Sequence, residues 1–410
     1  MNFETYMANR FRKSKTYKST VSSPIIKISV SSIVIGIIMM LISISSSVGL
    51  QNTIKTKVSS LFGHISISNF KNNNSFSSLE PVKIDSENKS WESNSRIINI
   101  QYVAYKSGLI INKKSFEGVI FKGVSSNFNW NVFSNYIIDG NVINTSNELT
   151  NNVIISEYLS KKLSLELNQK FKTTFYKSNS IASPNERIFK VAGIYKSGFN
   201  EFDEVYFLGD IRHIQRMNKW KSDEIGNIEV LINDFNEIDN VTKQLYNETS
   251  SALNVQSIKE IYPDIFNWIA LFDINVLLII IIMILIGGIN MITALLVTVL
   301  EKASLIGVLK TLGSSNNSIR TIFLINGTYL ISQGMIIGNV ISILIIFLQN
   351  KTGFIKLDPE SYYISELPFD FNFSSILFLN IGVLVLCFLM LIIPSLIITK
   401  ISPSESVKIN

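Results

Sequence analysis

Four long apolar runs divide the chain, and charged residues are almost absent from them. The runs are residues 28–50, 269–300, 321–348 and 374–399. Each is at least as long as the roughly 20 residues that an α-helix needs to cross about 30 Å of hydrocarbon. The pattern therefore predicts four transmembrane helices. The first is diluted by serines, which suit helix contacts inside a bundle better than contact with lipid.

The stretch between the first two runs, residues 51–268, has a different period. Leu50, Ile54, Val58 and Leu61 continue the first helix beyond the lipid. Alternation of apolar and polar residues then predicts strands at 65–67, 97–105, 116–124, 153–156, 171–175, 188–195, 205–208 and 228–232. Helical spacing predicts helices at 157–165, 211–220 and 238–246. The expected fold is a membrane α-helical protein with a large α+β domain inserted between helices 1 and 2.

A short polar-flanked segment, residues 301–320, lies between the second and third runs. Leu305, Val308, Leu309 and Leu312 recur at helical spacing and predict an apolar stripe. Glu301, Lys302 and Lys310 flank this stripe, and Gly313 is placed to end the helix. A helix of two or three turns buries little area on lipid, so we interpret the stripe as a contact for a cytoplasmic partner protein.

Basic residues near the ends of the spans predict the orientation of the chain. Arg10, Arg12, Lys13, Lys15, Lys18 and Lys27 precede the first run, whereas only Lys351 and Lys356 lie in the loop 349–373. The positive-inside rule then places residues 1–27, 301–320 and 400–410 in the cytoplasm. It places residues 51–268 and 349–373 on the outer side. The net charge of +6 is interpreted as this topology signal and not as a nucleic-acid surface.

The sequence lacks the common signatures of an enzyme. It contains no phosphate-binding G-x-x-x-x-G-K-[ST] loop, no H-E-x-x-H pair and no G-x-S-x-G turn. His64 and His213 are far apart and stand alone, and Cys387 is the single cysteine. No charged residue lies deep in a span, which argues against an ion-coupled transporter. We expect no enzyme activity, bound cofactor or metal, and energy must come from a separate protein.

Four stretches resemble the MacB/FtsX-type ABC transporter permeases, and within them the LolC/LolE branch. They are 28–36 at the first span, 191–203 in the exported domain, the segment 301–314, and 362–368 before the last span. The segment 301–314 is similar to the coupling helix of that family. The chain departs from the family at Leu305, where an acid is usual, and in the loop 178–186, which is shorter.

The resemblance implies a permease subunit of a lipoprotein-releasing transporter in the bacterial inner membrane, with its large domain in the periplasm. Its partners would be a LolD-like ATPase dimer that uses ATP and magnesium, a second permease subunit, a LolA-like carrier, lipoprotein cargo and membrane lipid. The residues expected to contact the ATPase are Glu301, Lys302, Leu305, Ile306, Gly307, Val308, Leu309, Lys310, Leu312 and Gly313. The expected carrier-docking loop contains Ser178, Ile181, Pro184, Asn185 and Glu186. The expected lipid cavity is lined by Val34, Ile38, Leu41, Ile274, Leu277 and Ile281.

Two alternatives remain open at this point. A MacB-like exporter or an FtsX-like mechanotransmission permease would share this architecture but handle other cargo or none. A membrane-anchored binding or signalling protein would have no ATPase partner.

Overall fold

The computed structural model describes residues 3–13, 22–72, 77–84, 91, 94–112, 115–146, 148–175 and 184–400. Within these ranges, four helices are long and apolar enough to cross a membrane, as the sequence predicts: Pro24–Phe62, Pro263–Glu301, Asn316–Thr352 and Phe373–Thr399. The chain forms two compact units. Unit 1 comprises residues 1–51, 269–355 and 367–410, and unit 2 comprises residues 52–268 and 356–366.

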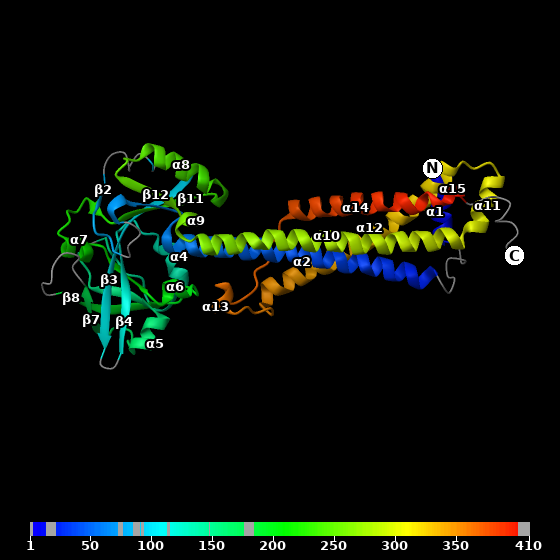
Figure 1. Ribbon diagram of the computed structural model, residues 1–410. Helices are drawn as coiled ribbons and strands as arrows, with labels where there is room; N and C mark the ends of the chain where they lie inside the picture. The colour runs from blue at the N-terminus through cyan, green and yellow to red at the C-terminus, as the bar shows by residue number, and fades with distance from the viewer. Residues whose placement is uncertain are drawn as a thin grey trace. The chain divides into compact units, whose positions relative to one another are not determined.

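Unit 1 is helical. Its elements are α1 (Phe3–Lys13), most of α2 (Ser22–Phe62), most of α10 (Pro263–Glu301), α11 (Ala303–Thr311), α12 (Asn316–Thr352), α14 (Phe373–Ser395) and α15 (Ile397–Lys400). In Figure 1, α14 runs alongside α12. Buried apolar side chains from six of these helices form one core, among them Ile37, Leu295, Ile306, Ile331, Leu391 and Ile398.

Small and polar residues hold the apolar helices of unit 1 together. The side chains of Asn339 in α12 and Asn380 in α14 donate to each other at 2.7 and 3.0 Å. Asn290 in α10 donates to Ser32 in α2 at 2.7 Å. Gly338 lies against Ile37, and a Cβ there would approach the Ile37 Cβ to 2.8 Å. Close backbone approach and side-chain hydrogen bonds replace the hydrophobic effect as the source of contact between membrane helices.

Unit 2 is the predicted α+β domain. Its strands are β1 (Ile65–Asn69), β2 (Val82–Lys83), β3 (Ile97–Asn112), β4 (Ser115–Val124), β5 (Ile137–Gly140), β6 (Asn152–Ser156), β7 (Lys170–Phe175), β8 (Asn185–Tyr195), β9 (Tyr206–Asp210), β10 (Glu224–Ile225), β11 (Asn227–Ile232) and β12 (Leu253–Ser257). Its helices are α4 (Trp130–Phe133), α5 (Glu157–Leu163), α6 (Asn200–Asp203), α7 (Arg212–Asn218), α8 (Ile238–Glu248), α9 (Ile258–Ile261) and α13 (Pro359–Tyr362).

Strand pairing in unit 2 forms a ring with an extension. Neighbouring strands pair in the order β3, β4, β9, β6, β8 and β7, and β7 pairs again with β3. These six strands therefore form a closed ring. From β3 the sheet continues through β11 and β1 to β12, and α8 packs on β12 (Figure 1). Phenylalanines fill the ring, with Phe121 stacked on Phe207 at 4.9 Å between centroids. His213 packs against Phe189 at 5.0 Å, so it is a core residue.

Candidate functional site

Helix α11 connects α10 to α12 and corresponds to the predicted coupling segment. A glycine ends it, as predicted: Gly313 has φ +87°. The N–H of Gly313 donates to the Lys310 carbonyl at 3.0 Å, and the N–H of Ser314 donates to the Leu309 carbonyl at 3.0 Å. This pair of bonds is a Schellman motif, which requires the left-handed conformation that glycine adopts without strain.

The predicted apolar stripe of α11 divides into two faces. Ile306 is 0% exposed and Leu309 8% exposed, and both belong to the core of unit 1. In contrast, Leu305, Val308 and Leu312 are 37%, 46% and 78% exposed. The interpretation of Leu309 as part of a free surface is therefore wrong, because its side chain already packs inside the unit. We call Leu305, Val308 and Leu312 the α11 outer face.

The polar residues of the same segment contact their neighbours. The Lys310 ammonium donates to the carbonyl of Ile398 in α15 at 2.9 Å. Glu301 and Lys302 lie 4.0 Å apart. Gly307 is buried beside Ile306. These contacts fix α11 to the helical unit and leave its outer face exposed.

The predicted carrier-docking loop is only partly a loop. Ser178 and Ile181 lie outside the described residues. Pro184 is exposed and precedes β8, but Asn185 and Glu186 are strand residues that pair with Phe175 and Thr174 of β7. Glu186 also accepts an ion pair from Lys172 at 2.6 Å. The prediction of a loop is therefore wrong at Asn185 and Glu186, whose polar side chains belong to strand β8.

The residues predicted to line a lipid cavity differ in exposure. Ile274, Leu277 and Ile281 of α10 are 57%, 56% and 47% exposed, and Val34 and Ile38 of α2 are half-buried. Leu41 is 2% exposed inside the core of unit 1. Its place in a cavity wall stays a prediction, because periodicity identifies an apolar side chain but not the neighbour that covers it.

Two stretches that resemble the permease family, 191–203 and 362–368, meet within unit 2. Phe199 packs on Tyr363 with centroids 5.1 Å apart, and the Lys57 ammonium donates to the Tyr363 carbonyl at 2.7 Å. The Asp203 carboxylate accepts hydrogen bonds from the hydroxyl of Ser197 at 2.6 Å and the N–H of Gly198 at 3.1 Å. Burial raises the pKa of Asp203, and these hydrogen bonds oppose that effect. The sequence identified both stretches but not their contact.

Comparison with known proteins locates two family domains in this chain. The MacB-like periplasmic core domain matches residues 28–247, and the FtsX-like permease C-terminal domain matches residues 277–403. The chain belongs to the MacB-like periplasmic core domain family. Unit 2 is thus a MacB-like core domain, and α11 lies within the FtsX-like permease region.

Two named proteins are similar to this MacB-like chain over most of its length, and a solved structure is similar over half of it. The lipoprotein-releasing system transmembrane protein LolC of Buchnera aphidicola subsp. Schizaphis graminum is 25% identical, over 93% of this chain and 92% of that protein. The lipoprotein-releasing system transmembrane protein LolE of Haemophilus influenzae is 22% identical, over 99% of each. The crystal structure of the periplasmic region of MacB from Actinobacillus actinomycetemcomitans is 16% identical, with a TM-score of 0.35, over 50% of this chain and 94% of that one.

The MacB-like core domain also contains a buried ion pair that was not predicted from the sequence. The Lys122 ammonium lies 2.8 and 3.0 Å from the two carboxylate oxygens of Glu229 and donates to the Leu61 carbonyl at 2.6 Å. The Tyr105 hydroxyl donates to the same carboxylate. Burial lowers the pKa of Lys122, and Glu229 opposes that effect. The signal was a lysine in line with the apolar residues Ile120 and Val124 on one face of a predicted strand.

The described residues of this MacB-like permease contain no group of three or more His, Cys, Asp or Glu side chains placed to hold a metal ion. The described structure does offer apolar faces, and unit 2 has cavities of about 320 and 290 Å³ that polar and apolar side chains line together.

Proposed function

We propose that this chain is the permease subunit of an ABC transporter that extracts lipoproteins from the outer leaflet of the inner membrane. A separate ATPase drives it, and a periplasmic carrier receives the lipoprotein. The observation that carries this proposal is the similarity to proteins named LolC and LolE over 93% and 99% of the chain. The similarity includes the membrane helices as well as the exported domain.

The proposed orientation has both termini and α11 in the cytoplasm and the MacB-like core domain in the periplasm. The excess of lysine and arginine before residue 28 supports this orientation. An ATPase would then reach the α11 outer face. A groove on the ATPase would cover the apolar side chains of Leu305, Val308 and Leu312, as grooves on other proteins cover amphipathic helices.

The proposed coupling depends on how α11 is anchored. Ile306 and Leu309 are buried with Phe323 of α12 and Ile398 of α15, and Lys310 bonds α15. A displacement of α11 by the ATPase would therefore move the packed helices as a body, because close-packed interiors transmit strain. A second permease copy and the acyl chains of the cargo would share the exposed side chains of α10, including Ile274, Leu277 and Ile281.

Reconstitution tests the function directly. Proteoliposomes would contain this chain, the ATPase that co-purifies with it and a triacylated lipoprotein. We expect ATP-dependent transfer of the lipoprotein to a soluble carrier. No transfer is expected with a hydrolysis-deficient ATPase. If the ATPase hydrolyses ATP but the lipoprotein stays in the membrane, the proposal is wrong, and export of a non-acylated substrate would then favour the MacB-like alternative.

A further inference from the structure

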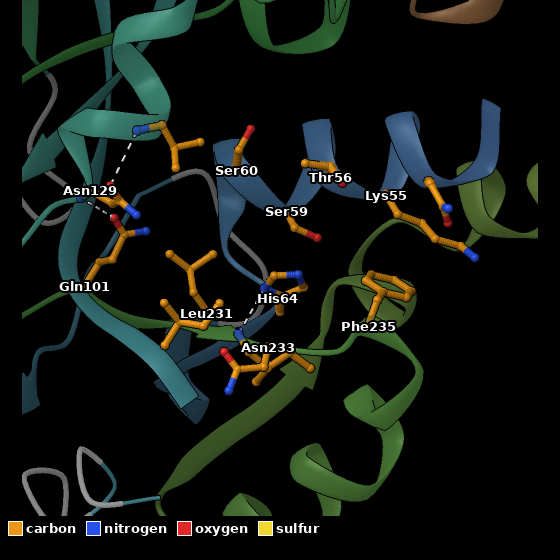
Figure 2. A pocket seen from close by; sticks show the side chains of 14 residues that line it. Lys55, Thr56, Ser59, Ser60, His64, Gln101, Asn129, Leu231, Asn233 and Phe235 are labelled. Carbon is orange, nitrogen blue, oxygen red and sulfur yellow. Dashed lines mark hydrogen bonds between the residues drawn. The ribbon is translucent and has the colours of Figure 1, made fainter. Parts of the chain in front are cut away.

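A cavity of about 320 Å³ lies in the MacB-like core domain, between the end of α2, the strands β3 and β11, and the start of α4 (Figure 2). This volume is at the lower end of the range of small-molecule sites. The described residues that line it are Asn52, Lys55, Thr56, Ser59, Ser60, His64, Ile98, Gln101, Asn129, Val132, Leu231, Ile232, Asn233 and Phe235.

The strongest sign of a ligand is a buried hydroxyl. Ser59 is 1% exposed, and its Oγ has no hydrogen-bond partner among the residues that the structure describes. Figure 2 shows this oxygen directed from α2 toward the side of the cavity that His64 occupies. Buried polar groups in native proteins are nearly always paired, so an unpaired hydroxyl in a cavity wall indicates a missing partner.

A second donor faces the same space. The Nδ1 atom of His64 accepts the N–H of Ile232 at 3.2 Å, so a neutral ring carries its proton on Nε2. Burial lowers the pKa of His64 to about 4, so the ring is neutral at physiological pH. The imidazole therefore presents an N–H donor to the cavity.

The charge of the cavity and the polarity of its walls indicate which chemical class of ligand it would bind. Among the described lining residues Lys55 alone carries a formal charge, and it is positive. Its ammonium lies 5.5 Å from the centroid of the Phe235 ring. Ile98, Val132, Leu231, Ile232 and Phe235 form apolar walls. The cavity thus combines the positive charge of Lys55, the uncharged donors Ser59 and His64, and apolar walls. A ligand that matches this combination carries one negative charge on an apolar body.

We propose that this cavity is a binding site for a small carboxylate with an apolar body. The carboxylate accepts hydrogen bonds from Ser59 and His64 near the Lys55 ammonium, and the body packs on Phe235 and Leu231. Inorganic phosphate fits less well, because it has nothing to place against the apolar walls. The proposal is independent of lipoprotein release, and its test requires no transport.

The test is ¹⁹F NMR of 4-fluorophenylacetate with the full chain in lipid nanodiscs, using empty nanodiscs as the reference for partition into lipid. We expect saturable line broadening by the anion and much weaker broadening by the neutral analogue 4-fluorophenylacetamide. Lys55→Gln is expected to weaken binding about tenfold, because it removes a charge-assisted contact. The control is Lys243→Gln, which removes the same charge from an exposed position of α8 outside the cavity and is expected to leave binding unchanged.

Ser59→Ala separates a ligand site from a packing defect. We expect it to weaken binding of the anion severalfold and to raise the thermal midpoint of the ligand-free protein, because it removes an unpaired buried hydroxyl. Equal binding of the anion and the amide, equal effects of Lys55→Gln and Lys243→Gln, or no saturable binding would each overturn the proposal.

Discussion

Lys122 and Glu229 place two opposite charges inside the MacB-like core domain, where their side chains are 0% and 1% exposed. Removing a charge from water is costly, and the pair is tolerated because the ammonium and the carboxylate satisfy each other and two further partners, Leu61 and Tyr105. Leu61 lies one residue before the end of α2, where free carbonyls attract a cation. At the scale of single residues, this pair fixes the end of a long helix to the sheet.

Lys122→Met is expected to lower the free energy of unfolding by about 3 kcal/mol or more, because Glu229 is left buried without its counter-ion. The double variant Lys122→Met/Glu229→Leu should recover much of that loss. Thermal unfolding in detergent, followed by tryptophan fluorescence, measures both. Lys172→Met is the control: it breaks an ion pair whose side chains are 53% and 50% exposed and should cost less than about 1 kcal/mol. Equal losses of unfolding free energy in the single and double variants would show that the unpaired charge of Glu229 is not the cause of the destabilisation.

His64 makes stability depend on pH. The unfolded chain binds a proton at this residue below about pH 6.5, whereas burial lowers the pKa in the folded protein to about 4. The free energy of unfolding that depends on a neutral His64 is thus complete above about pH 6.5. It is lost as the pH falls toward about 4, because the unfolded chain takes up a proton there and the folded protein does not. The full loss is on the order of 3 kcal/mol.

His64→Gln cannot titrate, so its thermal midpoint should fall less than that of the wild-type protein between about pH 7.5 and about pH 5. His213 is present in both proteins, so its own titration cancels from the difference. Parallel pH profiles for the two proteins would show that His64 is not protonated on unfolding.

At the scale of elements, α11 has two apolar faces with different roles. Ile306 and Leu309 hold it in the helical unit, and the outer face is exposed. Sequence periodicity marked the apolar positions of this helix, but it did not distinguish the side that is already covered. Substitutions on the two faces should therefore have different consequences.

Val308→Asp is expected to reduce co-purification of the ATPase at least tenfold without lowering the thermal midpoint, since Val308 is 46% exposed. Leu309→Asp should lower the midpoint itself, because it buries a charge. The control is Asn317→Asp, which adds a charge at an exposed position in the first turn of α12. It should change neither the co-purification of the ATPase nor the thermal midpoint. Unchanged association in the Val308 variant would exclude the α11 outer face as the coupling surface.

Helix packing in unit 1 depends on glycine at a close contact. A side chain at Gly338 would meet Ile37 at 2.8 Å and the Val34 carbonyl at 3.1 Å. Gly338→Leu should separate α12 from α2 and lower stability by about 1–3 kcal/mol or more. At Gly382 in α14, a Cβ would meet nothing within 4 Å in the described structure. Gly382→Leu is therefore the matched control, and an equal loss in both variants would argue against specific packing at Gly338.

At the scale of the whole molecule, four apolar helices and one large α+β domain define a membrane permease of the MacB-like family. The proposed function requires that the domain and α11 lie on opposite sides of the membrane. An ATPase in the cytoplasm would otherwise never reach the α11 outer face. This requirement can be tested without knowledge of the cargo.

Single cysteines in a Cys387→Ala background test the orientation. A membrane-impermeant maleimide added to intact spheroplasts should label Asn151→Cys but not Asn317→Cys, and both positions are exposed in the structure. Permeabilised cells should show labelling at both. Labelling of both positions in intact spheroplasts would place α11 and the core domain on the same side and refute the proposed coupling.

Most elements of unit 2 could be predicted because their patterns are local. The predicted strand 116–124 is β4 (Ser115–Val124), and the predicted helix 157–165 is α5 (Glu157–Leu163). The prediction at 97–105 was too short, since β3 continues to Asn112 past Lys106, Ser107 and Gly108, which interrupt the apolar alternation. Strand β12 (Leu253–Ser257) was missed, because it carries polar residues and pairs only with β1.

The sequence by itself determined the number of apolar spans, the α+β character of the inserted domain and the end of α11 at Gly313. These properties depend on hydrophobic length, residue period and backbone preference, which are encoded locally. Only the tertiary structure decided that Leu309 and Leu41 are covered, that Lys122 meets Glu229, and that Ser59 and His64 share a cavity. Those properties arise between residues far apart in the chain, and a pattern along one segment holds no information about what packs against it.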